Sequence, residues 1–419
     1  MKPKSLFFLV LVILPCLLHG QEEKNDFGIH LGGFVKGDFF HDSRQTVAAR
    51  EGHFLLWPAA EDLDAKDKDM NAVPNFNFLA IQTRLKGTIT GPDAFGAKTS
   101  GVIEGAFFGH TNADINGFRL RHAFVKFKWD NTAVLAGQYW HPMFVTGCFP
   151  GTVSFNTGAP FQPFSRNPQL RITHSLGNLS IIAAALSHRD FVTAAGSAGL
   201  RNSGLPDINL QLHYSSENQE TSTAFLAGIG AEHKTIVPRL ESQIGNANYK
   251  IDESVSSSAA MAFAKVKLPA LTFKVEGVYG QNLYDLLMIN SFASTRVVDP
   301  ATGEMEYTST NLYSVWTDIH TNGKTLQAGL FAGYTANLGS GEFESPPNMS
   351  NFAGTRHDIA NVMRVAPRII FNSGKARFSG ELEYTSAASG DGTFDADGVP
   401  LNTTTASNIR FLVGIYYFF

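Results

Sequence analysis

Charged residues are scarce in this sequence. Of its 419 residues 17% are charged, and Phe residues (34) outnumber Lys and Arg together (33). A soluble globular domain averages about 25% charged residues. The composition therefore argues against the two or three soluble domains that the length alone would allow.

Long hydrophobic runs are also missing. The longest spans Leu6–Leu18 at the N-terminus, whereas a membrane-spanning helix needs about 20 apolar residues. Helical membrane proteins are thereby excluded. Disorder is excluded as well, because aromatic and β-branched residues occur along the whole chain.

The N-terminal segment is typical of an export signal. Lys2 and Lys4 precede the apolar run, and polar residues follow from Gln21 onward. This pattern predicts a secretory signal peptide over residues 1–20, cleaved after Gly20, and a mature domain over residues 21–419.

Cysteine is nearly absent. Cys16 lies within the signal peptide and follows Leu14-Pro15 rather than the small residues of a lipidation site. Cys148 is then the single cysteine of the mature chain, so no intramolecular disulfide can form. An exported chain of this length must be stabilised by its architecture instead.

What the sequence does contain is a period of two. Along 409–419 the residues Ile409, Phe411 and Val413 alternate with Arg410, Leu412 and Gly414, and similar alternation covers 271–279, 326–334 and 377–384. Such alternation indicates β-strands with one apolar face. No stretch after residue 20 sustains a period of 3.6, so we predict an all-β protein. Aromatic residues near strand ends, Trp140 and Tyr416 among them, are expected at the membrane interface.

Connector lengths distinguish among all-β folds. Seven short turns alternate with eight long polar connectors, which together join about sixteen strands of about ten residues each. The long connectors are His41–Asn75, His110–Asn116, His141–Asn167, Arg189–Leu205, Thr235–Ser254, Asn282–Thr310, Ala336–His357 and Ala387–Ser407. This pattern predicts a transmembrane antiparallel β-barrel in a Gram-negative outer membrane, with short periplasmic turns and long extracellular loops. Fourteen or eighteen strands are the alternatives, and a secreted sandwich is the alternative fold.

Alternation also predicts which side chains face the lumen. If the apolar residues of each strand face lipid, as we expect of Leu79, Ile81 and Leu85, the opposite set faces the pore. The basic residues predicted to line the pore are Arg84, Lys86, Arg119, Arg121, Arg171, Arg364, Arg368 and Arg410. Rings of Arg and Lys favour anions.

Fewer carboxylates are expected inside, namely Asp38, Glu276, Glu381 and Glu383. The alternative to a selective pore is that the arginines pair with Asp or Glu of neighbouring strands and only stabilise the wall. A register slip of one residue would invert the assignment on a strand.

The connector 141–167 is unusually apolar. It combines Pro142, Pro150, Pro160 and Pro163 with several Phe and Met residues. An exposed loop has no need of such a composition, so we expect this segment to fold into the barrel and constrict the pore, stiffened by proline. Cys148 is expected to pack there as a small apolar residue.

Several segments of the first 175 residues also resemble a known family. They are Phe34-Val-Lys-Gly-Asp38, the stretches 118–125 and 135–140, Phe155-Asn156 and Arg166-Asn-Pro-Gln-Leu-Arg171. Their order and spacing are similar to those of the DcaP-like trimeric outer-membrane porins, and the chain looks like a Bacteroidetes-type porin barrel. The resemblance implies a homotrimer of sixteen-stranded barrels in contact with outer-membrane lipids, which passes small anionic or polar solutes, dicarboxylates among them. The N-terminal helical extension of some members is not expected here, because about six residues separate Gln21 from the first strand.

Enzymatic and metal-binding motifs are lacking. The 13 His residues form no H-x-x-x-H or H-E-x-x-H pair, and no G-x-S-x-G elbow occurs. Asp62 and Asp64 begin like a calcium loop, but Lys66 and Lys68 stand at ligand positions. We therefore expect neither an enzyme nor a cofactor, and no nucleic-acid partner. An outer-membrane phospholipase or protease, or an adhesion or structural barrel, is the alternative.

Overall fold

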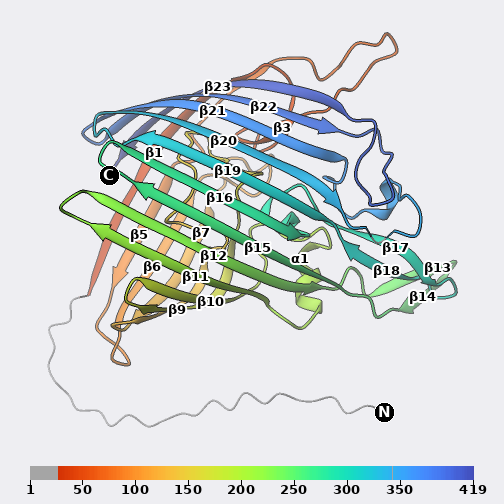
Figure 1. Ribbon diagram of the computed structural model, residues 1–419, viewed down its shortest axis with the longest axis horizontal. Coiled ribbons are helices and arrows are strands. Elements are labelled where there is room, and N and C mark those ends of the chain that lie inside the picture. The colour runs from red at the N-terminus through yellow and green to blue at the C-terminus, as the bar shows by residue number, and fades with distance from the viewer. Residues whose placement is uncertain (1–26, 342) are drawn as a thin grey trace.

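The chain forms one closed antiparallel β-barrel (Figure 1). The computed structural model describes residues 27–341 and 343–419, so the predicted signal peptide lies outside the described residues. The main sheet contains seventeen strands, of which β4 and β5 both pair with β1 and form two halves of one crossing. Pairing of β1 with β23 closes the sheet. The prediction of a sixteen-stranded barrel is thus confirmed.

The barrel strands follow one another around the wall in chain order. They are β1 (Gly28–Asp42), β4 (Asn75–Leu79) with β5 (Arg84–Thr90), β6 (Lys98–Ala106), β7 (Arg119–Lys128), β8 (Thr132–Trp140), β9 (Arg166–Leu176), β10 (Leu179–Leu186), β11 (Asp207–Asn218), β12 (Thr223–Ile236), β15 (Val255–Lys267), β16 (Leu271–Gln281), β19 (Asn311–Thr321), β20 (Leu326–Gly339), β21 (Ile359–Ser373), β22 (Ala376–Ser389) and β23 (Thr404–Phe418).

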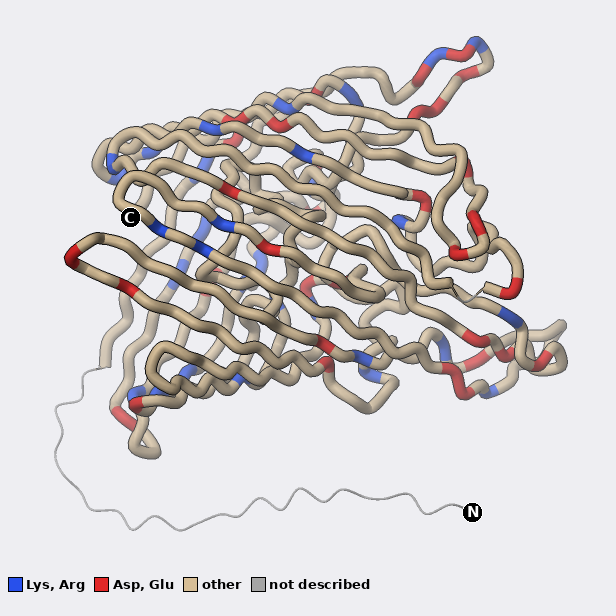
Figure 2. The backbone as a smooth tube through the Cα atoms, viewed as in Figure 1, with Lys and Arg blue, Asp and Glu red and all other residues tan. Residues whose placement is uncertain are grey.

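The two ends of the barrel differ. One end, which we name the short-turn rim, carries tight connections such as 177–178 and 219–222. The other, the long-loop rim, carries L1 (43–74), L3 (141–165), L4 (187–206) and L6 (282–310), among other loops. By the usual rule for such barrels the short turns face the periplasm. Acidic residues gather on several of the long loops (Figure 2).

Small elements lie within the long loops. They are β2 (Thr46–Ala49) and β3 (Phe54–Pro58) in L1, α1 (Gly196–Asn202) in L4, the hairpin β13 (Glu241–Ile244) and β14 (Ala247–Lys250), then η1 (Tyr284–Leu286), β17 (Phe292–Asp299) and β18 (Glu304–Ser309) in L6, and η2 (Met349–Asn351). No helix of the described residues is long and apolar enough to cross a membrane.

Burial alternates along the strands as the sequence predicts. On β23 the side chains of Ile409 and Phe411 are exposed on the outer face, whereas Arg410 between them is 1% exposed. On β11 Leu210 is exposed and its neighbour Asn209 is fully buried. These strands therefore present an apolar face outward and polar groups inward, which is what a barrel in lipid requires.

The second crossing departs from this prediction. A turn in which Thr83 N–H donates to the Ala80 carbonyl (3.1 Å) separates β4 from β5 and shifts the phase of alternation. As a result Phe76 and Phe78 face outward, and Ile81 is buried in the interior. Leu79 has the opposite parity to Phe78 and packs against the interior clusters, whereas Leu85 is exposed as expected. The expectation that Leu79 and Ile81 face lipid is therefore wrong, because a turn inserted within the crossing acts as the register slip that inverts a strand.

Two predicted interface aromatics also lie inside. The Trp140 ring stacks on Phe144 of L3, with ring centroids 3.9 Å apart. Tyr416 lines an interior cavity and lies under the Lys36 ammonium group, 4.7 Å from its ring centroid. Both rings therefore belong to the lumen rather than to the membrane interface.

Candidate functional site

Loop L3 lies against the inner wall of the barrel. The Val153 and Ser154 N–H groups donate to the Glu381 carboxylate (2.7 and 2.8 Å). The Gly151 N–H donates to Asp318 Oδ2 (3.1 Å), and Ser314 Oγ donates to the Phe161 carbonyl (3.0 Å). L3 is thus held by strands β19 and β22, far from it in sequence. The loop ends at Ser165, two residues before the predicted end of the connector at Asn167, because β9 begins at Arg166.

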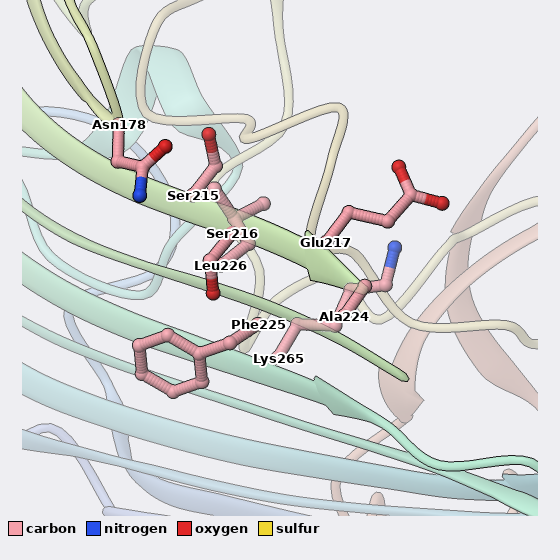
Figure 3. Close-up of a pocket in the computed structure, with 8 residues that line it drawn as sticks. All are labelled: Asn178, Ser215, Ser216, Glu217, Ala224, Phe225, Leu226 and Lys265. Atoms are coloured by element: carbon pink, nitrogen blue, oxygen red, sulfur yellow. The ribbon is translucent and has the colours of Figure 1, made fainter. Parts of the chain in front are cut away.

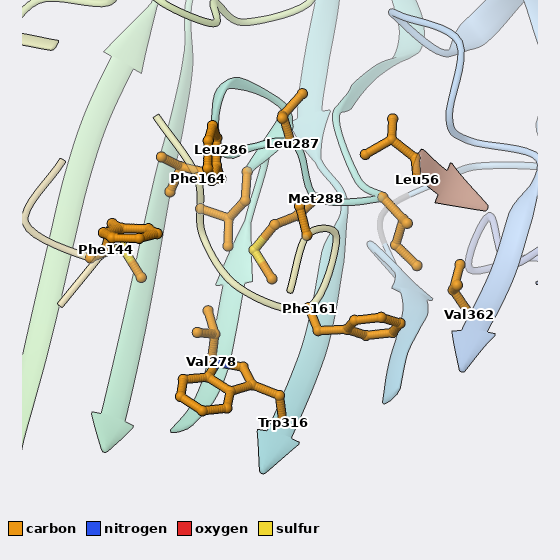
Figure 4. Packing of buried hydrophobic residues seen from close by; sticks show 14 of the residues in the cluster. Leu56, Phe144, Phe161, Phe164, Val278, Leu286, Leu287, Met288, Trp316 and Val362 are labelled. Carbon is orange, nitrogen blue, oxygen red and sulfur yellow. The ribbon is translucent and has the colours of Figure 1, made fainter. Parts of the chain in front are cut away.

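Apolar side chains from three loops fill the space around L3 (Figure 4). Leu56 of β3 in L1, Phe161 and Phe164 of L3 and Met288 of L6 belong to one buried cluster with wall residues such as Trp316. Burial of this much apolar surface accounts for the composition of 141–165. It also fixes three loops of the long-loop rim inside the barrel.

Two of the predicted lumen arginines form paired salt bridges with carboxylates. Arg368 binds both oxygens of Asp318 (2.7 and 3.1 Å). Arg410 binds both oxygens of Asp42 (2.9 and 2.6 Å) and also donates to the Gly52 carbonyl (2.8 Å). These buried two-point pairs match the alternative interpretation of the sequence, in which the arginines pair with acids of the wall and stabilise it.

Arg364 joins two inserted loops to the wall. Its guanidinium donates to the Ala159 carbonyl of L3 (2.8 Å) and to the Leu56 carbonyl of L1 (2.6 Å), and Nε lies 3.7 Å from Glu383. The side chain is fully buried. Its place among loop carbonyls makes it an anchor for both loops.

Arg119 and Arg121 also have carboxylate partners. Arg119 forms an ion pair with Asp190 of L4, which also binds Arg166 Nε (2.7 Å). Arg121 Nε donates to Glu104 (2.8 Å). The number of carboxylates expected inside the barrel is therefore too low. Asp42, Glu104, Asp190 and Asp318 lie inside with the four predicted ones.

The other predicted residues are less constrained. Arg84 is 22% exposed at its side chain and lies 3.4 Å from Glu104. Arg171 donates to Gln169 and to the Trp140 carbonyl, and Lys86 is exposed. Among the described residues neither Arg171 nor Lys86 forms an ion pair. They and Arg84 are the members of the predicted set whose charge is least compensated.

A cavity of about 410 Å³ lies between L3 and the wall. Arg84, Arg121 and Arg377 line it, together with Tyr416 and the L3 stretch 149–155. Among these lining residues there are three guanidinium groups and no carboxylate, and Glu104 is the acid that contacts two of them. We name this cavity the arginine chamber. The set of lumen residues predicted from the sequence does not include Arg377. Its position was open to prediction, because Arg377 directly precedes the outward-facing Phe378 and its side chain therefore points inward.

Two further cavities lie nearer the two rims of the barrel. One of about 390 Å³, lined by Arg50, Arg119, Arg189 and Asp190, lies beside L1 and L4 near the long-loop rim. Another of about 250 Å³ lies near the short-turn rim, where the ends of the Glu217 and Lys265 side chains point toward each other (Figure 3). Positive charge therefore exceeds negative charge at the first of these sites, and the two balance at the second.

Cys148 is buried within L3. Its thiol lies 3.5 Å from the Ala264 carbonyl, and burial raises the pKa of the thiol to about 12. The group is an inert apolar contact and cannot serve as a nucleophile at neutral pH.

Comparison with known proteins supports the fold. No protein-family model matches the chain, and no curated protein sequence matches it significantly. Among solved structures, the outer-membrane channel DcaP of Acinetobacter baumannii is similar with a TM-score of 0.64 at 16% identity, over 94% of this chain and 97% of that one. The anion-selective porin of Comamonas acidovorans has a TM-score of 0.53 at 11% identity, over 94% and 100%. OmpT of Vibrio cholerae in its trimer form has a TM-score of 0.53 at 12% identity, over 94% and 99%.

At these identities the likeness establishes the fold alone. That fold is a closed barrel with a period-two apolar exterior, and only a closed barrel lets strands span a bilayer without unpaired edges. The chain is therefore a porin-type sixteen-stranded β-barrel, a multi-pass protein of a Gram-negative outer membrane.

Proposed function

We propose that the chain is a passive diffusion channel, rather than an enzyme, and that it favours small anions, including dicarboxylates. The arginine chamber is the observation that carries the proposal. Three guanidinium groups line a cavity bounded by L3, and the one carboxylate beside them, Glu104, contacts two of the three. Arg remains charged at any physiological pH and can hold a carboxylate through two parallel hydrogen bonds.

Charge near the long-loop rim supports the same direction of selectivity. Arg50, Arg119 and Arg189 face Asp190 in the outer cavity, so an anion would meet excess positive charge before it reaches L3. Several spaced cations attract an anion without trapping it, which conduction requires. Arg171 and Lys86 add charge to the wall by the same reasoning. Arg364, Arg368 and Arg410 contribute less, because their partners neutralise them.

The direct test is electrical. We expect the purified, folded chain to form channels in planar bilayers, and a salt gradient to give a reversal potential of the sign set by anion permeation. Solutes such as succinate should then reduce the chloride current by competing for the arginine chamber. Cation selectivity, or the absence of conductance in a correctly folded sample, would overturn the proposal.

We also propose a homotrimer that associates through the outer barrel wall. The outer faces of β1, β5 and β6 carry an apolar groove of about 410 Å³ lined by Leu31, Leu85 and Ile103, and one similar structure is described as a trimer. We expect the mass of the protein measured in detergent, after correction for bound detergent, to be three times that of the monomer. The Bacteroidetes-type assignment and the signal peptide over residues 1–20 remain predictions.

A further inference from the structure

A buried cluster of ionisable groups lies where three long loops meet the wall. His188 follows β10 in L4, Asp207 begins β11, and Asp285 lies in η1 of L6. His141 at the start of L3 and Glu232 of β12 lie on the other side of Asp207. All five side chains are at least nine-tenths buried, and neither the arginine chamber nor the apolar cluster includes any of them.

The cluster carries an excess of negative charge. Asp207, Glu232 and Asp285 supply three carboxylates, and within residues 27–341 and 343–419 Lys234 is the one ammonium group in contact with them (2.5 Å to Asp285 and 3.5 Å to Glu232). The buried Arg356 guanidinium also acts on Asp285, although it donates its hydrogen bonds to the Tyr284 and Met288 carbonyls. With neutral imidazoles, the three carboxylates therefore still exceed the two cations inside the protein. A buried charge without a partner is strongly unfavourable, so either protons or a cation must supply the difference.

At one point of the cluster, a carboxylate oxygen and an imidazole nitrogen are not fully used by hydrogen bonds. His188 Nε2 lies 3.1 Å from Asp207 Oδ2 and 3.2 Å from Asp285 Oδ2. One N–H can serve only one of these oxygens, and Asp285 Oδ2 has no hydrogen-bond partner among the described residues. His188 Nδ1 also lacks one there, so it can carry the ring proton while Nε2 offers its lone pair.

His141 has a different role. Its Nδ1 accepts a hydrogen bond from the Met143 N–H (3.3 Å), which places the ring proton on Nε2. Nε2 lies 3.6 Å from Asp207 Oδ2 and 3.3 Å from Glu232 Oε2. His141 is therefore a neighbour that orients the Asp207 carboxylate rather than a ligand.

We propose that His188, Asp207 and Asp285 form a binding site for one divalent transition-metal ion, of which Zn²⁺ is the probe. One imidazole with two carboxylates is a donor set that such ions accept. Ligand atoms about 2.1 Å from the ion would be separated by roughly 3.0–3.4 Å. His188 Nε2 lies 3.1 Å from Asp207 Oδ2 and 3.2 Å from Asp285 Oδ2, within that range. The ion would offset the excess negative charge and join L4 and L6 to the wall. This inference does not depend on the proposed channel function.

Titration of the folded, tag-free chain tests the site. After removal of metals with EDTA, calorimetry with ZnCl₂ should show one ion per chain. We expect binding to be lost in Asp207→Asn and His188→Gln, and weakened about 10- to 100-fold in His141→Gln, as for an orienting neighbour. His233→Gln is the matched control, because His233 follows Glu232 on β12 but is exposed on the outer face. It should bind like the parent chain.

Folding is checked in each variant by heat-modifiable migration. If the Asp207 variant does not fold, X-ray absorption at the zinc edge of the parent protein decides, since it should show one imidazole with oxygen ligands. An all-oxygen shell would overturn the proposal. So would equal binding by Asp207→Asn, or no uptake by the parent chain, in which case protons on the imidazoles balance the cluster.

Discussion

Arg84 and Arg377 offer the sharpest test of anion selectivity. Both line the arginine chamber, and removing them leaves the buried pair of Arg121 with Glu104 (2.8 Å) in place. Arg377 donates to Asn372 (2.8 Å) and forms no ion pair among the described residues. Arg119 is a poorer choice, because its loss would leave Asp190 with fewer partners.

The expected size of the effect follows from Coulomb's law. A unit charge about 7 Å away across water is worth about 0.6 kcal/mol, close to the thermal energy. Screening at physiological salt reduces this to about 0.25 kcal/mol. Loss of one arginine removes that much attraction for an anion in the chamber and that much repulsion for a cation. The anion-to-cation permeability ratio should therefore fall about twofold per residue, and about fivefold for Arg84→Ala with Arg377→Ala.

Reversal potentials in a tenfold KCl gradient measure this ratio. Arg201→Ala is the control, because Arg201 is exposed in α1 on the long-loop rim and bonds its own helix backbone. It should leave the ratio nearly unchanged. An unshifted potential in a folded double variant would show that the chamber charges do not act on permeating ions, and the selectivity argument would be refuted.

Three further predictions concern stability and assembly. Asp318→Ala should destabilise the barrel by about 3–5 kcal/mol, because it leaves the Arg368 guanidinium buried without a partner. Urea unfolding in detergent should show this loss of stability. The double variant Asp318→Leu with Arg368→Met should have a free energy of unfolding close to that of the parent chain. An unchanged stability in Asp318→Ala would contradict the pairing. Cys148 should react with maleimide at pH 8 far more slowly in the folded than in the denatured chain, since a thiol with a pKa of about 12 is almost wholly protonated there. Fast labelling of the folded chain would show that L3 opens. Deleting Phe419 should impair assembly, because its N–H bonds the Gly33 carbonyl (3.2 Å) at the closing seam, and normal yields of heat-modifiable barrel would count against it.

Much of the fold could be predicted because a lipid-exposed barrel imposes a local pattern. Alternation alone placed Arg410 inside and Ile409 and Phe411 outside, and the structure agrees. The same rule failed at Ile81, where a short turn changes the phase within one crossing. Local periodicity cannot reveal such a turn, because Ala80–Thr83 contains neither Gly nor Pro.

The partners of the lumen residues could not be predicted in the same way. Asp42 and Arg410 are 368 residues apart in sequence, and Asp318 and Arg368 are 50 apart. Which acid meets which arginine depends on strand register and on how the loops dock. The cluster around Asp207 shows the same limit, because its ligands come from two loops and one strand and no spacing motif connects them.

The seam between β1 and β23 has a consequence for the route by which the chain folds. Phe34 lies opposite Phe418 there, and the Asp42–Arg410 pair joins positions 368 residues apart. Closing a ring of that size costs roughly 5 kcal/mol of chain entropy, whereas the hairpins of the short-turn rim close only a few residues each. The sheet should therefore grow from its hairpins as an open, curling ribbon, with both outer edges unsatisfied until the last step. Until that step those edges can pair with another chain, so slowing the seam alone should favour intermolecular aggregates over monomeric intermediates.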